Sequence, residues 1–89
     1  MKQNDTNDTF LPLSHYKEGD TVILHRINGS GPFKKRLLEM GFIKGVAMKI
    51  VKYAPLRDPL ELMVKGYYLS LRVNEAELVD VQKKEGING

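Results

Sequence analysis

The sequence predicts a small, mostly β-stranded domain with one short helix. Alternating apolar and polar residues recur in short stretches bounded by glycine, proline and asparagine, which is typical of strands separated by turns. One stretch, Phe33–Met40, instead spaces its apolar residues by three and four, which is typical of a helix. With 89 residues, the chain is long enough for one domain only.

The first strand and the helix follow one another in the chain. Thr21–Ile27 is rich in β-branched and aliphatic residues, and the turn-forming segment 28–32 ends it. Pro32 suits the first turn of a helix, which Phe33–Met40 continues. Gly41 is placed to end that helix in the left-handed conformation.

Three more strands are expected in the middle of the chain. Val46–Tyr53 alternates cleanly, and the two prolines of segment 54–59 end it because proline lacks a backbone donor. Leu60–Lys65 alternates again, and Gly66 allows a tight turn into Tyr67–Arg72. These last two stretches are therefore expected to form a hairpin.

The last elements complete a small barrel. Asn74–Glu77 reads as a single helical turn with Asn74 as its cap, and Leu78–Val81 reads as a final strand. About five short strands with one short helix are typical of a partly closed barrel of the SH3-like or OB-like kind. The domain is expected to span residues 10–82. Residues 1–9 are expected to be a disordered tail, and residues 83–89 are expected to fray.

Composition excludes several classes of protein. The chain has no cysteine, so it has no disulfide and no cysteine-based metal site. The longest stretch without a charged residue is Thr9–Tyr16, far short of the ~18–20 residues that span a bilayer. Met1–Asp8 lacks the apolar core of a secretory signal. A cytoplasmic location without direct membrane insertion is therefore expected.

Basic residues are concentrated in one part of the chain. Segment 32–52 carries six lysines and arginines against Glu39 alone, although the net charge of the whole chain is only +3. Lys34 and Lys35 lie at the start of the helix, where the helix dipole favours acidic residues. This conflict indicates either a functional basic face or a merely solvated one.

Three parts of the chain together resemble the FeoA family. Arg36–Gly45 is similar to the helix-and-turn signature of FeoA domains. Segment 54–60 is similar to their proline loop, and segment 64–76 is similar to their closing hairpin and final turn. The resemblance covers residues 13–81. The residues of these motifs have a structural explanation in turns, capping and packing. They are Arg36, Leu37, Met40, Gly41, Gly45, Pro55, Pro59, Gly66, Arg72 and Glu75.

The resemblance implies an SH3-like barrel and a function. It implies a non-enzymatic, cytoplasmic accessory protein of ferrous iron uptake. Its expected partner is the cytosolic part of the membrane transporter FeoB, which would recruit it to the inner face of the membrane. The predicted contact residues are Lys34 and Lys35 on the helix and Leu56, Arg57 and Asp58 in the proline loop, since a rigid loop with one apolar tip suits docking. The alternative for Leu56 is that it covers an open end of the barrel.

No catalytic residue and no tightly bound cofactor are expected. The two histidines, His15 and His25, have no partner at metal-ligand spacing, so a specific metal site stays unknown. Weak contact of exposed carboxylates with Fe(II) or another divalent metal is compatible with the sequence. No serine lies in a nucleophile motif.

Two other functions remain as alternatives. The basic segment fits a small nucleic-acid-binding barrel, but Tyr53, Tyr67 and Tyr68 lie outside the basic helix, where stacking would need them. Nucleic acid is therefore not the expected partner. A transition-metal-sensing domain is the second alternative, and it would need a set of converging ligands that the spacing does not indicate.

Overall fold

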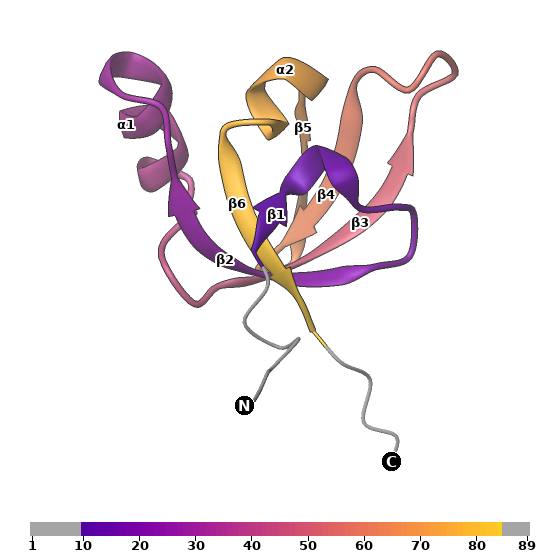
Figure 1. The fold of residues 1–89 in the computed structure, drawn as a ribbon, viewed down its shortest axis with the longest axis horizontal. Coiled ribbons are helices and arrows are strands. Elements are labelled where there is room, and N and C mark those ends of the chain that lie inside the picture. Colours follow the sequence, from indigo (N-terminus) through magenta and orange to yellow (C-terminus); the bar gives the residue numbers. More distant parts are fainter. Residues whose placement is uncertain (1–9, 85–89) are drawn as a thin grey trace, which may run out of the picture.

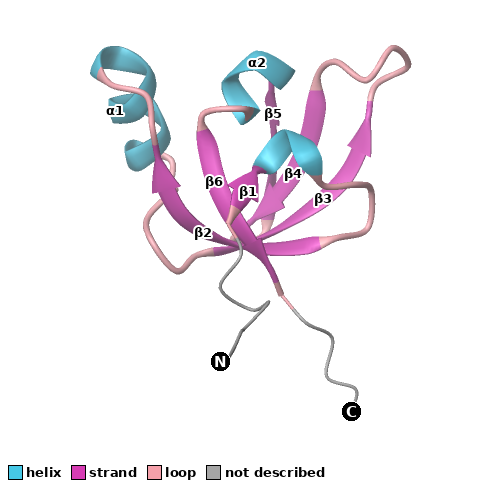
Figure 2. Cartoon of the chain, viewed as in Figure 1, coloured by secondary structure: helices cyan, strands magenta, loops and turns pink. Residues whose placement is uncertain are grey.

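The computed structural model describes residues 10–84, which form one six-stranded antiparallel sheet and two short helices (Figure 1). The elements are β1 (Leu11–Pro12), the 3₁₀ helix η2 (Leu13–His15), β2 (Thr21–Ile27), α1 (Gly31–Glu39), β3 (Ala47–Tyr53), β4 (Leu60–Val64), β5 (Tyr67–Leu71), α2 (Val73–Ala76) and β6 (Val79–Lys83). The predicted mostly β fold, with a helix after the first long strand and a helical turn before the last strand, is confirmed (Figure 2).

Four strands have the predicted bounds to within one residue. The clearest alternation is in β4, where Leu60, Leu62 and Val64 are completely buried and the residues between them are partly exposed. The turn from β4 to β5 has two residues with positive φ, Lys65 at 52° and Gly66 at 87°. Two successive positive φ angles match the twist of a two-residue hairpin, which is the predicted connection.

Helix α1 is attached to the sheet mainly through one residue. Leu37 is its single fully buried side chain. Ser30 precedes the helix as N-cap, Pro32 lies in its first turn, and Gly41 ends it with a φ of 97°. The backbone N–H of Phe42 then donates to the carbonyl oxygen of Leu37 at 3.0 Å, and the Phe42 ring is completely buried. The chain after the helix therefore folds back onto the core.

The structure has one strand more than the five expected. Leu11 and Pro12 form β1 by pairing with Val81 and Asp80 of β6. A two-residue strand that contains proline has no alternating pattern, so the sequence gives no signal for it. The segment matters nonetheless, because Leu13, which follows it in η2, is completely buried.

The end of the chain also differs from expectation. Helix α2 begins one residue earlier than predicted, and its N-cap is Arg72, not Asn74. The reason is that the carboxylate of Glu75 accepts a hydrogen bond from the backbone N–H of Arg72 at 2.9 Å. Strand β6 continues to Lys83, and the N–H of Lys84 donates to the carbonyl oxygen of Thr21 at 2.8 Å. The prediction that Lys83 and Lys84 belong to a frayed end is therefore wrong; residues 85–89, like the predicted tail 1–9, lie outside the described residues.

The sheet bends around the core without closing. Its strand order is β1-β6-β2-β3-β4-β5, so within residues 10–84 the two outer strands, β1 and β5, each pair on one side only. Helix α2 lies between α1 and the loop that joins β3 to β4, all three at the same end of the sheet (Figure 1). Across the part of the chain that the structure describes, no helix has the length and apolar character needed to cross a membrane.

Candidate functional site

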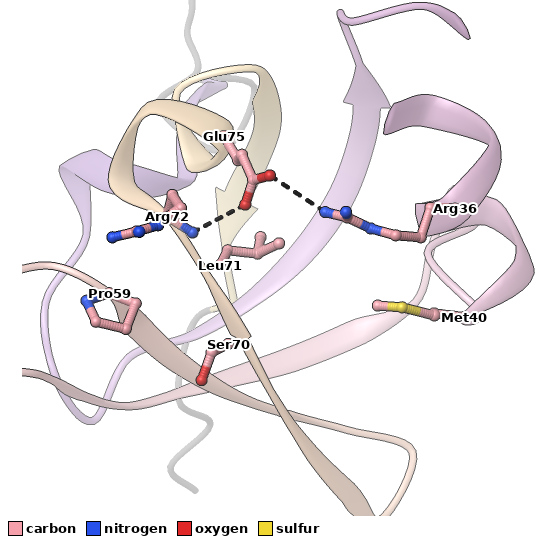
Figure 3. A pocket seen from close by; sticks show the side chains of 7 residues that line it. All are labelled: Arg36, Met40, Pro59, Ser70, Leu71, Arg72 and Glu75. Carbon is pink, nitrogen blue, oxygen red and sulfur yellow. Dashed lines mark hydrogen bonds and ion pairs between the residues drawn. The ribbon is translucent and has the colours of Figure 1, made fainter. Parts of the chain in front are cut away.

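A pocket of about 340 Å³ lies between the two helices and strand β5 (Figure 3). Helix α1 contributes Arg36, its C-cap residue Met40 follows, and α2 contributes Glu75. The rest of its lining is Pro59, Ser70, Leu71 and Arg72. Five of the ten predicted motif residues therefore meet at one place, although they come from three separate parts of the chain.

Glu75 holds the two helices together across this pocket. One carboxylate oxygen accepts the backbone N–H of Arg72 at 2.9 Å, which fixes the start of α2. The other lies 3.2 Å from the Nη2 atom of Arg36 on α1 (Figure 3). The first contact satisfies an unpaired donor at a helix start, which typically stabilises by about 1 kcal/mol. The ion pair is more than half exposed on the arginine side, so it adds at most about 1 kcal/mol.

The same C-terminal end of α1 is also fixed to β5. The hydroxyl group of Tyr67 donates to the carbonyl oxygen of Met40, the C-cap residue of the helix. Arg36 and Met40 therefore face the pocket from the C-terminal end of α1, which is held by two contacts. The remaining motif residues have backbone or core positions: Leu37 is buried, Gly41, Gly45 and Gly66 have positive φ, and Pro55 is exposed in the loop.

The proline loop projects from the sheet and is internally bonded. The N–H of Ala54 donates to the carbonyl oxygen of Pro59 at 2.9 Å, which closes the base of the loop. The N–H of Arg57 donates back to the carbonyl oxygen of Ala54 at 2.7 Å. At the tip, 96% of the Leu56 side chain is exposed. The alternative in which Leu56 covers the end of the barrel is therefore wrong, and the loop presents an apolar anchor to solvent.

Arg57 connects the loop to the body of the domain. Its guanidinium carbon lies 4.2 Å from the centre of the Tyr53 ring, a favourable cation–π distance. The hydroxyl group of Tyr53 donates to the carbonyl oxygen of Tyr16 at 2.6 Å. Burial raises the pKa of Tyr53 above its ordinary value of 10.0, and the positive charge of Arg57 opposes that rise. Arg57 therefore contacts the body of the domain, whereas Leu56 stays exposed at the tip of the loop.

Asp58 is also used inside the molecule. Its Oδ1 atom accepts the backbone N–H of Val73 at 3.2 Å and lies 4.0 Å from Nη1 of Arg72. Asp58 therefore joins the proline loop to the start of α2. Sequence reasoning grouped it with the contact residues because its partners are fifteen residues away, beyond the reach of a local pattern.

The structure does not bring the predicted contact residues into one patch. Lys34 and Lys35 are exposed on α1, whereas Leu56 lies in the loop between β3 and β4. These two elements stand on opposite sides of α2 (Figure 1). A partner that touches both would have to extend across α2 and the pocket beneath it.

Metal-binding residues do not gather in the described part of the chain. Among residues 10–84, no group of three or more histidine, aspartate or glutamate side chains is placed to hold a metal ion. His25 instead stacks on Phe10, with ring centres 3.8 Å apart and an angle of 16° between the rings.

Comparison with known proteins decides the family. A family model described as the FeoA domain matches residues 11–83. The chain belongs to the FeoA family. This FeoA domain is 41% identical over 72 residues to a protein of Porphyromonas gingivalis named Fe(2+) transport protein A/Fe(2+) transporter FeoB fusion protein. The match covers 81% of this chain and only 8% of that relative, which is a far longer protein.

Solved structures of FeoA proteins show the same fold. The FeoA protein of Chlorobium tepidum is 33% identical, with a TM-score of 0.81 over 89% of this chain and 75% of that chain. The FeoA of Stenotrophomonas maltophilia, solved in complex with zinc, is 27% identical, with a TM-score of 0.70 over 79% of this chain and 87% of that chain. The latter is a prokaryotic SH3 domain protein, so the predicted SH3-like fold is confirmed.

Proposed function

We propose that this FeoA-family chain is a non-enzymatic accessory protein of ferrous iron uptake that binds the cytosolic part of a FeoB-type transporter. The observation that carries the proposal is the Porphyromonas gingivalis relative, in which a similar domain and the transporter share one chain. A domain that is covalently joined to a transporter in one organism is expected to act beside it when the two are separate chains. Its expected location is the cytoplasm, at the inner face of the membrane.

The geometry of the proline loop supports a binding role. Leu56 is almost fully exposed on a loop whose base and turn are fixed by backbone hydrogen bonds. A rigid loop loses little conformational entropy when a partner buries its tip. A single apolar anchor that enters a pocket is also the usual centre of a binding hot spot. Leu56 is therefore the proposed anchor, with Lys34 and Lys35 as contacts across α2.

Metal contact is proposed only in a weak form. The Stenotrophomonas maltophilia FeoA has been solved with zinc. For this chain we propose no resident metal cofactor, and only contact of exposed carboxylates with Fe(II) or another divalent metal. Equilibrium dialysis with Fe(II) under anaerobic conditions would measure this contact, and a stoichiometric, micromolar site would favour the metal-sensing alternative instead.

The docking proposal is tested with one substitution. The wild-type chain and a Leu56→Asp variant are titrated with the cytosolic domain of the transporter, and affinity is measured by calorimetry. Loss of the anchor should weaken binding by about tenfold or more, equivalent to about 1.4 kcal/mol. Because Leu56 is exposed, the unfolding free energy should change by no more than about 0.5 kcal/mol.

A matched control replaces another exposed side chain. Tyr68, of which 61% is exposed on β5, is changed to serine, and this variant should bind like the wild type. Equal binding by Leu56→Asp and wild type would remove Leu56 from the interface. If the wild type did not bind the transporter domain but bound random oligonucleotide with a steep salt dependence, the nucleic-acid alternative would replace the proposal.

A further inference from the structure

A second hollow lies on the far side of α1 from the pocket described above. It has a volume of about 320 Å³ and is formed by β2, α1 and the segment that follows α1. Its floor is apolar, because Leu24, Ile27 and Phe42 are buried beneath it. Leu38 of α1 forms one wall and is 44% exposed. Among the apolar side chains that line the hollow, Leu38 is therefore the one that remains substantially accessible.

The rim of this hollow is basic. Its lining contains His25, Arg26, Lys34 and Lys44 and includes no aspartate or glutamate. Arg26 lies 3.9 Å from Asp80 and is thereby partly neutralised. Lys34 and Lys44 form no ion pair within residues 10–84. Within the described residues, the ammonium groups of Lys34 and Lys44 therefore lie without an ion-pair partner at the edge of one apolar floor.

A smaller hollow continues this surface. It has a volume of about 170 Å³ and shares Leu24, His25 and Lys44 with the first. Its wall is the Phe10 ring, which stacks on His25. We call the two hollows together the basic groove. Lys44 stands where they meet, and its neighbour Ile43 is 51% exposed.

We propose that the basic groove binds an acidic amphipathic segment of a protein partner. A large apolar side chain of that segment would fill the hollow beside Leu38, and flanking carboxylates would pair with Lys34 and Lys44. The inference rests on the proposed function, because the partner that it specifies is the cytosolic part of the transporter. It adds a second contact surface, distinct from the Leu56 loop, and the chemistry that this surface recognises.

The shape of the groove favours a protein segment over a lipid surface. The recessed hollow can take one projecting side chain of a partner segment, whereas its floor cannot itself enter a bilayer. Nucleic acid would need free aromatic rings beside the lysines for stacking, whereas the exposed ring of Phe10 in this groove is already stacked on His25. A side chain inserted into the hollow would exclude water from the rim, and the lysine–carboxylate pairs would become stronger than exposed surface pairs.

The test compares two double charge reversals in the full chain. Lys34→Glu with Lys44→Glu inverts the groove rim. Lys49→Glu with Lys84→Glu makes the same change in net charge at exposed lysines outside the groove. Affinity for the transporter's cytosolic domain is measured by calorimetry at two salt concentrations. The groove variant should lose roughly 30-fold or more in affinity, and the control should lose less than about threefold.

A neutral variant separates apolar contact from charge. Leu38→Ser should weaken binding by about fivefold or more without changing net charge, because it removes the wall of the hollow. Chemical shifts of the wild-type backbone amides should move at residues 24–27 and 38–44 when the transporter domain is added. Circular dichroism melting of each variant confirms that it is folded before its affinity is compared.

The outcomes separate this inference from the proposed function. Binding that is lost with Leu56→Asp but unchanged by the groove variants overturns the inference and leaves the proposed function standing. Absence of binding by the wild type overturns both. Groove-dependent sedimentation with phosphatidylglycerol vesicles, without binding to the transporter domain, would assign the groove to a lipid surface and overturn the proposed partner.

Discussion

Tyr53 shows how one residue connects the exposed loop to the core. Its ring lies under the Arg57 guanidinium, and its hydroxyl group donates to the carbonyl oxygen of Tyr16. Tyr16 in turn donates its own hydroxyl group to the carbonyl oxygen of Val81 in β6 at 3.1 Å. Burial is the main cause that raises the pKa of both tyrosines above the ordinary value. The loop, η2 and the last strand therefore share one chain of contacts.

This arrangement predicts a loss of stability at alkaline pH. Since the folded-state pKa of Tyr16 and Tyr53 lies above the unfolded value, both phenols hold their protons longer in the folded chain. Their contribution is complete below the unfolded pKa and is lost as pH rises through the folded pKa. The unfolding free energy should therefore fall as the pH rises above about 10.

Urea unfolding across this pH range measures the effect, and Tyr53→Phe is the comparison. The variant should lose about 1 kcal/mol at neutral pH, because the hydrogen bond to the Tyr16 carbonyl is gone. Its stability should then depend less steeply on alkaline pH than that of the wild type. Identical slopes for the two proteins would show that Tyr53 ionises alike in the folded and unfolded chain.

At the scale of elements, the strands could be predicted from sequence and the short helix α2 could not be placed correctly. Strands such as β4 alternate between buried and partly exposed residues, so a pattern of period two identifies them. The start of α2 depends on Glu75 accepting the N–H of Arg72, whereas Asn74 is a favoured cap residue by type. An element as short as α2 has too few residues for a periodic pattern to show where it begins, so a single contact decides its first residue.

The link between α1 and α2 predicts unequal effects of removing its two partners. Glu75→Ala loses both the helix-start hydrogen bond and the ion pair, so it should destabilise the domain by about 1–2 kcal/mol. Arg36→Ala loses only the exposed ion pair and should cost less than about 1 kcal/mol. Urea unfolding of both variants and of the double variant gives the coupling between the residues.

Glu75→Gln is the matched control for this pair. Its amide oxygen can still accept the Arg72 N–H, so it should retain most of the stability that Glu75→Ala loses. A coupling free energy near zero between the Arg36 and Glu75 substitutions would mean that the 3.2 Å ion pair contributes nothing measurable to the stability of the domain. In that case the pocket would keep its shape through the Tyr67–Met40 contact and the core position of Leu37 alone.

For the molecule as a whole, the sequence singled out five of the seven residues that line the pocket but not their convergence. Resemblance singled out Arg36, Met40, Pro59, Arg72 and Glu75, yet no local pattern shows that they meet across two helices and a strand. The basic groove was foreseen only as an excess of charge in one segment. Its apolar floor depends on how α1 packs against β2, which is a long-range property of the fold.

The N-terminal segment is expected to complete the whole fold despite its weak sequence signal. Leu13 is completely buried, and β1 pairs with β6 through Leu11 and Pro12. A chain that begins at residue 14 should lose about 3–5 kcal/mol, because it lacks the Leu13 side chain and leaves a cavity in the core. Such a loss is a large share of the ~5–15 kcal/mol that stabilises a typical domain.

Leu13→Ala in the full chain distinguishes side-chain burial from strand pairing. If burial dominates, this variant should account for most of the loss, about 2–5 kcal/mol by urea unfolding. If the loss is small in Leu13→Ala but large in the chain that begins at residue 14, the pairing of β1 with β6 is the stabilising contact. Equal stability of all three chains would place the boundary of the domain after Leu13, and the SH3-like sheet would then be complete with its five longer strands.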